Sequence, residues 1–275
     1  MGARLAGLAA AAALIVAPAA ASAQDEGFPA GSETVTSGSV SATLSWEAGQ
    51  IGAKNATLAI TRGGSALFAQ KISDVVCDEC FLNTSDDVQV VDLDQDSEPE
   101  VVVAGTSGEE CCVRMGVYDF RTASGGYGEL FEDWRGAGFE LSDLDRDGQP
   151  DIATGDLRFE DVFAGLGLWF LPPTVFHYQH QDGIPYMLNV TRGFPALIRK
   201  NAAQAKRGLK GFHRGDPGAR GLVTAYVADQ YLLGHGSAGL REFDRQSARG
   251  ILGSPRRAKA FRKRLLRMLH DFDYR

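Results

Sequence analysis

Two acidic segments of the chain share one spacing of carboxylates. Residues 143–152 have the sequence DLDRDGQPDI, and residues 92–101 have the sequence DLDQDSEPEV. Both place carboxylates at positions 1, 3, 5 and 9 and a proline at position 8. The carboxylates are Asp143, Asp145, Asp147 and Asp151 in one segment and Asp92, Asp94, Asp96 and Glu100 in the other. A repeated nine-residue pattern is more specific than a single acidic cluster, so both segments are candidate cation sites.

Calcium is the cation that this pattern suits best. Ca²⁺ takes six to eight oxygen ligands at about 2.3–2.6 Å, and a tight turn with carboxylates at alternate positions surrounds one point. Glycine at position 6, as at Gly148, allows the sharp turn, and position 7 can offer its backbone carbonyl. Several carboxylates in a partly desolvated loop repel one another strongly. The sequence therefore predicts bound Ca²⁺, and the alternative is a pair of fully solvated acidic turns without metal.

The segments are not EF-hands, because that loop needs a Glu at position 12, where these have Thr154 and Val103. An apolar β-type stretch follows each segment instead. This DxDxDGxxD arrangement resembles the FG-GAP or VCBS-type repeat of integrin-like propellers and many bacterial surface proteins. The resemblance implies that the eight carboxylates hold calcium between strands of propeller blades, with Ser97 departing from the pattern. The wider order of segments is similar to uncharacterised exported proteins of high-GC actinobacteria.

The β-rich part is too short for a closed propeller. A closed ring needs at least four blades, and about 165 residues provide two or three. We therefore expect an open β domain.

Four cysteines occur in two pairs, Cys77 with Cys80 and Cys111 with Cys112. An even number in an exported chain predicts disulfides. Neighbouring Cys111 and Cys112 are too close to bridge each other. We therefore expect two cross-links, each joining Cys77 or Cys80 to Cys111 or Cys112, with the pairing open. A four-thiolate zinc site is the alternative, although the adjacent pair leaves no residue for a chelating turn.

The N-terminus has the layout of a secretory signal peptide. Residues 1–4 form a short positive start, residues 5–20 are apolar, and residues 21–23 (Ala-Ser-Ala) fit the cleavage pattern. A membrane anchor is the alternative, but the apolar run is short for a span of about 20 residues. We expect a secreted, extracellular or cell-surface protein, with no transmembrane segment in the mature chain.

Charge divides the chain into two parts. Residues 24–191 carry 29 acidic and 8 basic side chains, whereas residues 192–275 carry 6 acidic and 19 basic ones. We predict an α+β protein in three parts: a signal peptide at 1–23, a β-rich domain of blade-like antiparallel strands at 24–191, and a small basic helical domain at 192–275. The opposite charges also allow the two domains simply to attract each other.

Periodicity assigns the elements of both domains. Strands are predicted over residues 57–61, 66–72, 88–91, 101–103, 113–118, 175–178 and 186–190. Helices are predicted from residue 195 onward and over residues 222–233, 238–250 and 255–270. The last helix has apolar residues at spacings of three and four and a strongly basic opposite face.

The sequence favours a non-catalytic function. It contains no GxSxG, HExxH or Walker motif. His177 and His180 lie three apart on a predicted strand, which points them to opposite faces and argues against a shared metal. We predict an exported binding or structural module with calcium-stabilised loops, whose partner is another surface protein or an anionic envelope polymer and not nucleic acid. The alternatives are a metal-dependent hydrolase that uses the acidic cluster, and adhesion to envelope polymer through the basic C-terminal helix.

Overall fold

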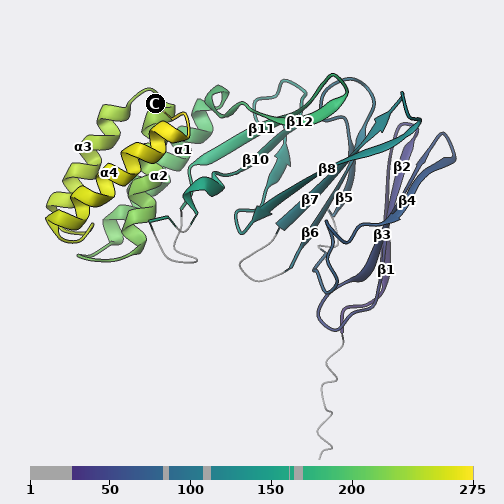
Figure 1. Cartoon of the computed structure of the whole chain (residues 1–275), viewed down its shortest axis with the longest axis horizontal. Helices are drawn as coiled ribbons and strands as arrows, with labels where there is room; N and C mark the ends of the chain where they lie inside the picture. Colours follow the sequence, from purple (N-terminus) through teal and green to yellow (C-terminus); the bar gives the residue numbers. More distant parts are fainter. Residues whose placement is uncertain (1–26, 83–86, 108–112, 161, 164–169, 275) are drawn as a thin grey trace, which may run out of the picture.

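The computed structural model describes residues 27–82, 87–107, 113–160, 162–163 and 170–274. The predicted signal peptide lies outside these residues. The chain forms three four-stranded antiparallel sheets, followed by four α-helices. Figure 1 shows the sheets in a row along the long axis of the molecule, with the helices at one end. The α+β class, with β-rich structure before helical structure, is therefore confirmed.

Each sheet is an up-and-down meander, so neighbouring strands in the chain are neighbours in the sheet. The first sheet contains β1 (Gly31–Ser37), β2 (Val40–Glu47), β3 (Lys54–Arg62) and β4 (Ser65–Lys71). The second contains β5 (Val88–Val91), β6 (Glu100–Thr106), β7 (Val113–Arg121) and β8 (Gly126–Arg135). The third contains β9 (Glu140–Ser142), β10 (Asp151–Gly155), β11 (Pro173–Gln181) and β12 (Ile184–Asn189). The acidic segments connect β5 to β6 and β9 to β10, so both occupy the same place in their sheets.

The second sheet is buried on both faces. Along β6, Val101 and Val103 pack into a core shared with the first sheet, while Val102 packs into a core with Ile152 and Tyr178 of the third sheet. Alternate residues of a strand point to opposite faces, which explains the continuous run of valines in a strand covered on both sides. The first and third sheets thus lie on opposite faces of the second (Figure 1).

The helical part contains α1 (Pro195–Gly208), α2 (Gly218–Leu232), α3 (Gly236–Ala248) and α4 (Pro255–Asp271). The four helices predicted from the sequence are confirmed, and Pro195 and Pro255 stand in the first turns of α1 and α4. The apolar stripe of α4 is buried in the helical core, and its basic stripe faces outward. Among the described residues, every helix is too short or too polar to cross a membrane.

The cysteine prediction is wrong for one of the two pairs. Cys77 and Cys80 are joined to each other, and their Cα atoms lie 5.1 Å apart. A turn in which the Cys80 amide donates to the Cys77 carbonyl (3.0 Å) brings the two side chains together. This local bridge replaces the long-range cross-links expected to Cys111 and Cys112, which lie outside the described residues.

Candidate cation-binding loops

The two acidic segments, called loop 1 (residues 92–100) and loop 2 (residues 143–151), fold into the same backbone shape. Position 4 has a positive φ in both, 63° at Gln95 and 67° at Arg146. Position 6 also has a positive φ in both loops, 71° at Ser97 and 93° at Gly148. Left-handed backbone favours glycine. Ser97 therefore adopts the turn at some strain, and its departure from the repeat pattern does not change the shape of loop 1.

The first carboxylate of each loop closes the turn by accepting a backbone hydrogen bond. Oδ2 of Asp92 accepts from the amide of Ser97 (3.0 Å), and Oδ2 of Asp143 accepts from the amide of Gly148 (3.1 Å). Position 5 acts in the same way in both loops, because Asp96 and Asp147 each accept from the amide two residues later. Local side-chain bonds of this kind are what make Asp suited to turns.

The carboxylate at position 9 anchors each loop to the strand that follows it. Oε2 of Glu100 accepts from the amide of Leu93 (2.7 Å), and Oδ2 of Asp151 accepts from the amide of Leu144 (2.8 Å). Glu100 is 3% exposed and Asp151 is 0% exposed. The two segments thus share their backbone shape and the hydrogen bonds that carboxylates at positions 1, 5 and 9 accept from backbone amides, which makes them repeats in structure.

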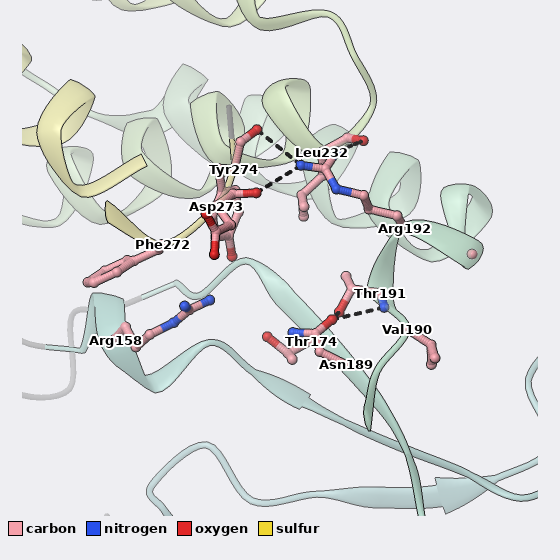
Figure 2. A pocket seen from close by; sticks show the side chains of 11 residues that line it. Arg158, Thr174, Asn189, Val190, Thr191, Arg192, Leu232, Phe272, Asp273 and Tyr274 are labelled. Carbon is pink, nitrogen blue, oxygen red and sulfur yellow. Dashed lines mark hydrogen bonds between the residues drawn. The ribbon is translucent and has the colours of Figure 1, made fainter. Parts of the chain in front are cut away.

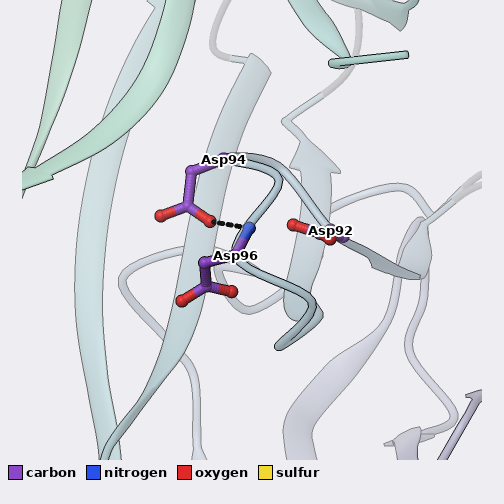
Figure 3. Close-up of side chains that lie close together, drawn as sticks. All are labelled: Asp92, Asp94 and Asp96. Carbon is purple, nitrogen blue, oxygen red and sulfur yellow. Dashed lines mark hydrogen bonds between the residues drawn. The ribbon is translucent and has the colours of Figure 1, made fainter.

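Three carboxylates in each loop lie close enough to share one ion. Asp92, Asp94 and Asp96 offer oxygens within 4.8 Å of one another, and so do Asp143, Asp145 and Asp151. Figure 3 shows the first set, in which the carboxylate of Asp94 also accepts from the amide of Asp96 at 3.3 Å. The predicted ligands Glu100 and Asp147 fall outside these sets, so loop 1 gathers positions 1, 3 and 5, whereas loop 2 gathers positions 1, 3 and 9.

One oxygen in loop 1 fits a bound cation particularly well. Oδ1 of Asp92 is buried and has no hydrogen-bond partner among the described residues. A buried polar oxygen without a partner is costly, and a cation beside it removes that cost. The donor set of both loops is entirely oxygen, which suits Ca²⁺ and not zinc or copper.

Burial shifts the ionisation of the loop carboxylates. It raises the pKa of Glu100 to about 8, and the nearby charges of Asp94 and Asp96 add to the rise. Burial also raises the pKa of Asp151 and of Asp96 above the ordinary value, even though hydrogen bonds to backbone amides oppose the shift. Desolvation disfavours the charged form of an acid. A cation bound at the loops would act in the opposite direction.

Two histidines of β11 each hold a carboxylate of a different loop. Nε2 of His177 lies 2.8 Å from Oδ1 of Asp151 in loop 2. His180 lies 2.8 Å from Oδ2 of Asp94 in loop 1 through Nδ1, and 3.3 Å from Oδ2 of Asp119 through Nε2. Each histidine therefore contacts a different loop, and His180 connects the third sheet to loop 1 of the second sheet.

The residue that sequence reasoning missed is Asp119 of β7. It is 3% exposed, and its Oδ1 has no hydrogen-bond partner among the described residues. It lines a hollow of about 660 Å³ beside loop 1, together with Asp94, Asp96 and His180. In the sequence it is an ordinary acidic residue in a strand that alternates, so no local signal distinguishes it.

The two loops also contact each other directly. Nε2 of Gln149 in loop 2 donates to the carbonyl oxygens of Leu93 in loop 1 (2.9 Å) and Tyr178 in β11 (3.4 Å). In return, Nε2 of Gln95 donates to the carbonyl oxygen of Asp147 (3.3 Å). Positions 4 and 7, which the repeat pattern leaves free, thus join the second and third sheets.

Replacing Gln149 with alanine tests this connection. We expect Gln149→Ala to lower the free energy of unfolding by about 1–2 kcal/mol, because the carbonyls of Leu93 and Tyr178 lose a partly buried donor. Urea denaturation in the presence of a chelator measures the change without any contribution from metal. Gln70→Ala, at an exposed position of β4, is the control and should stay within about 0.5 kcal/mol. Equal effects of the two variants would show that the contact between the loops contributes nothing.

A second hollow of about 660 Å³ lies where the third sheet meets the helices (Figure 2). Its two arginines are already paired. Arg192 donates to the backbone carbonyls of Leu232, Asp273 and Tyr274. Arg158 forms a two-point contact with Asp156 (2.8 and 2.7 Å). Arg192 thereby joins the sheet to the helices, and the guanidinium of Arg158 lies 4.6 Å from the ring centre of Phe272. We therefore assign this hollow a structural role.

Comparison with known proteins gives one distant likeness. Neither a protein-family model nor a solved structure matches the chain significantly. A stretch of 171 residues, 60% of the chain, is 25% identical to a probable thylakoid lumen protein of the cyanobacterium Synechocystis sp.. The match covers 50% of that protein, so the chain spans about half the length of this relative.

Proposed function

We propose that this chain is an exported, non-catalytic binding or structural module whose two acidic loops are ordered by calcium. The observation that carries the proposal is that both loops adopt the same backbone turn and that each gathers three carboxylates within 4.8 Å, at positions 1, 3 and 5 in loop 1 and at positions 1, 3 and 9 in loop 2. Carboxylates in a fully solvated turn gain nothing by converging on one point, because like charges repel. Convergence of three carboxylates in each loop is the arrangement that one bound cation in each loop would require.

The chemistry of the loops favours Ca²⁺ over other cations. In loop 1, Asp92, Asp94 and Asp96 would bind the ion directly, and in loop 2 Asp143, Asp145 and Asp151 would do so. Backbone carbonyls and water can complete the six to eight oxygens that Ca²⁺ takes, whereas Mg²⁺ demands a stricter octahedral arrangement. The ion would neutralise the repulsion between the carboxylates and hold the turns that join neighbouring strands.

The arrangement of the sheets supports the resemblance to FG-GAP or VCBS-type repeats. A propeller blade is a four-stranded meander, and neighbouring blades pack face to face. Both loops connect the first and second strands of their own meander. In this proposal the second and third sheets are two calcium-bearing blades of an open stack.

Export is supported from two sides. The signal-peptide pattern of residues 1–23 stands at the N-terminus. The cyanobacterial relative is named for the thylakoid lumen, a compartment that proteins reach by translocation. We propose an extracellular or cell-surface location, with another surface protein or an anionic envelope polymer as the partner.

Calorimetric titration with calcium, paired with thermal melts in calcium and in chelator, tests the proposal. We expect two sites in the described chain. At about 10 mM Ca²⁺, a dissociation constant of about 10⁻⁴–10⁻³ M corresponds to about 1.4–2.7 kcal/mol of stabilisation for each loop. For a chain of this size that amounts to a rise in melting temperature of about 3–10 °C for each loop.

Variants of the loop carboxylates show which loop produces the calcium heat and the melting shift. Asp143→Asn with Asp145→Asn should remove one site, and Asp92→Asn with Asp94→Asn should remove the other. The matched control is Asp244→Asn with Asp271→Asn, two exposed carboxylates of the helices, which should leave both sites. Absence of heat and of any melting shift in the unmodified chain would contradict the proposal.

A metal-dependent hydrolase is the competing function, and one observation favours it. The buried carboxylate of Asp119 and the imidazole of His180 stand beside loop 1 in the hollow of about 660 Å³. We prefer a non-catalytic role because both ring nitrogens of His180 are already bonded to carboxylates. Hydrolysis of a nitrophenyl ester or phosphate by the purified chain, abolished in Asp119→Asn, would reverse this choice.

A further inference from the structure

Two helices of the C-terminal part begin with an arginine where helix electrostatics favour an acid. Arg220 lies in the first turn of α2 and Arg257 in the first turn of α4. Neither first turn contains an acidic residue. The N-terminus of a helix carries a partial positive charge, so anions stabilise it and cations destabilise it. Asp216 caps α2 by accepting from the amide of Gly218 (3.0 Å), whereas α4 is capped by the neutral hydroxyl of Ser254. Arg257 therefore stands where its charge is unfavourable, and an anion beside it would stabilise the first turn of α4.

The two arginines meet at the turn that leads into α4. Nη2 of Arg220 donates to the carbonyl oxygen of Leu252 at 3.4 Å. A Cβ placed on Gly253 would lie 3.6 Å from Nη2 of Arg220 and 3.6 Å from Cδ of Arg257. Gly253 has a φ of 94°, which permits this close turn. The first turn of α2 and the start of α4 are thus adjacent.

A hollow of about 410 Å³ lies at this junction, and three arginines line it. They are Arg220, Arg257 and Arg264, and the apolar lining includes Phe163 and Phe261. The guanidinium of Arg264 lies 5.3 Å from the ring centre of Phe163, and that of Arg220 lies 6.0 Å from the ring centre of Phe261. Aromatic faces attract cations, so these contacts hold two of the guanidinium groups in place without neutralising them.

The charge of the three arginines is not balanced by described carboxylates. Among the described residues, the ion pairs of arginines within the helices are Arg245 with Glu242 and Arg262 with Asp244. Within the described part of the chain, the three arginines of the hollow form no ion pair. The surrounding region, residues 192–275, carries 19 basic and 6 acidic side chains. Like charges held together in this way repel one another, and an anion bound among them would relieve the repulsion.

We propose that this hollow is a binding site for a phosphate group, carried as a phosphomonoester or phosphodiester by a larger ligand. Guanidinium groups match phosphate oxygens in two-point hydrogen bonds. The volume exceeds what a phosphate alone would fill, which leaves room against the phenyl rings for the moiety that carries it. The site lies on the helices and is independent of the calcium loops.

Inorganic phosphate and vesicles of phosphatidylglycerol are the probes that test this site on the full chain. Arg220→Gln with Arg257→Gln should weaken phosphate binding at least about tenfold, because each removes a charge-assisted contact. The matched control is Lys259→Gln with Lys263→Gln, two exposed residues of α4 outside the lining, which loses the same charge. We expect less than about a twofold change in this control. Arg220→Lys keeps the positive charge but lacks the paired N–H donors of a guanidinium. We expect it to cause an intermediate loss of phosphate affinity, with thermal melts confirming that the fold is unchanged.

The two probes distinguish the source of the phosphate. Vesicle binding that inorganic phosphate displaces and that the Arg220/Arg257 variant loses would identify a lipid headgroup. Phosphate binding without vesicle binding would identify a soluble or polymeric phosphorylated ligand. Equal losses in the hollow variant and in the lysine control would mean diffuse attraction to a basic face and would overturn the proposal. Absence of saturable binding to either probe would overturn it as well.

Discussion

Asp229→Asn is expected to raise the free energy of unfolding by about 3 kcal/mol at pH 8 and to change it little at pH 4. Asp229 of α2 is 0% exposed, and burial raises its pKa to about 8. Its Oδ2 accepts from Nδ2 of Asn201 (2.9 Å), whereas its Oδ1 has no partner among the described residues. The folded protein therefore holds this carboxyl in its protonated form.

The direction of the pH dependence follows from this raised pKa. The unfolded chain loses the Asp229 proton near pH 4, whereas the folded chain keeps it up to about pH 8. Folding thus requires uptake of a proton between these values, so this group lowers stability progressively as pH rises from about 4 to 8. A difference of this size corresponds to an upper limit of about 5 kcal/mol, at about 1.4 kcal/mol for each pKa unit. Asparagine has the shape of the protonated acid and removes the dependence.

Urea denaturation of both proteins between pH 4 and pH 8 measures the effect. Asp244→Asn, an exposed position of α3, is the control, and its change should stay within about 0.5 kcal/mol across the range. A gain for Asp229→Asn that is equal at both ends of the range would show that the carboxyl does not titrate between them. A loss of stability at pH 8 would show that Asp229 is ionised and compensated in the folded chain.

Tyr274→Ala is expected to lower the free energy of unfolding by about 3–5 kcal/mol. Tyr274 is 4% exposed, and its hydroxyl donates to Oδ2 of Asp156 at 2.7 Å. Its ring packs edge to face against Phe159, with ring centres 5.4 Å apart. Arg192 donates to the backbone carbonyl of the same residue. Since Asp156 directly follows β10, Tyr274 attaches the end of the helical part to the third sheet.

Tyr274→Phe separates the hydroxyl from the ring. It keeps the packing on Phe159, and Asp156 keeps its two contacts with Arg158, so we expect a loss of only about 1–2 kcal/mol. Chemical denaturation followed by tryptophan fluorescence measures both variants. Ile184→Ala, at a position 68% exposed, serves as the surface control and should change little. Equal losses for Tyr274→Ala and Tyr274→Phe would mean that the ring contributes nothing.

Local sequence patterns predicted much of the candidate site. The spacing of carboxylates in residues 92–100 and 143–151 identified two equivalent loops, because turn formation by Asp and the short apolar runs on either side are local properties. The same holds for the four helices, whose periodicity and prolines marked their positions. Which carboxylates face one point was less predictable. Position 5 joins the set in loop 1 but not in loop 2, and position 9 joins it in loop 2 but not in loop 1, and side-chain direction within a tight turn depends on the backbone that forms.

Contacts between distant residues could not be predicted. Asp119 and His180 meet across 61 positions, and Gln149 reaches Leu93 across 56. Residue type and spacing did not indicate these contacts, because they form only when the second sheet stacks on the third. For the cysteines the error was the reverse, since a local contact was predicted as a long-range one. A long-range pairing was expected, but the turn at residues 77–80 is tight enough for a local bridge.

The sequence by itself determined the division into an acidic β-rich part and a basic helical part, the two acidic loops and the positions of the helices. These follow from composition and periodicity, which act within a few residues of each position. Only the tertiary structure decided that β11 supplies a histidine to each loop, that Asp229 is buried without full pairing, and that three arginines surround one hollow. Such features depend on which surfaces come together when apolar faces are buried, and that is a property of the whole chain.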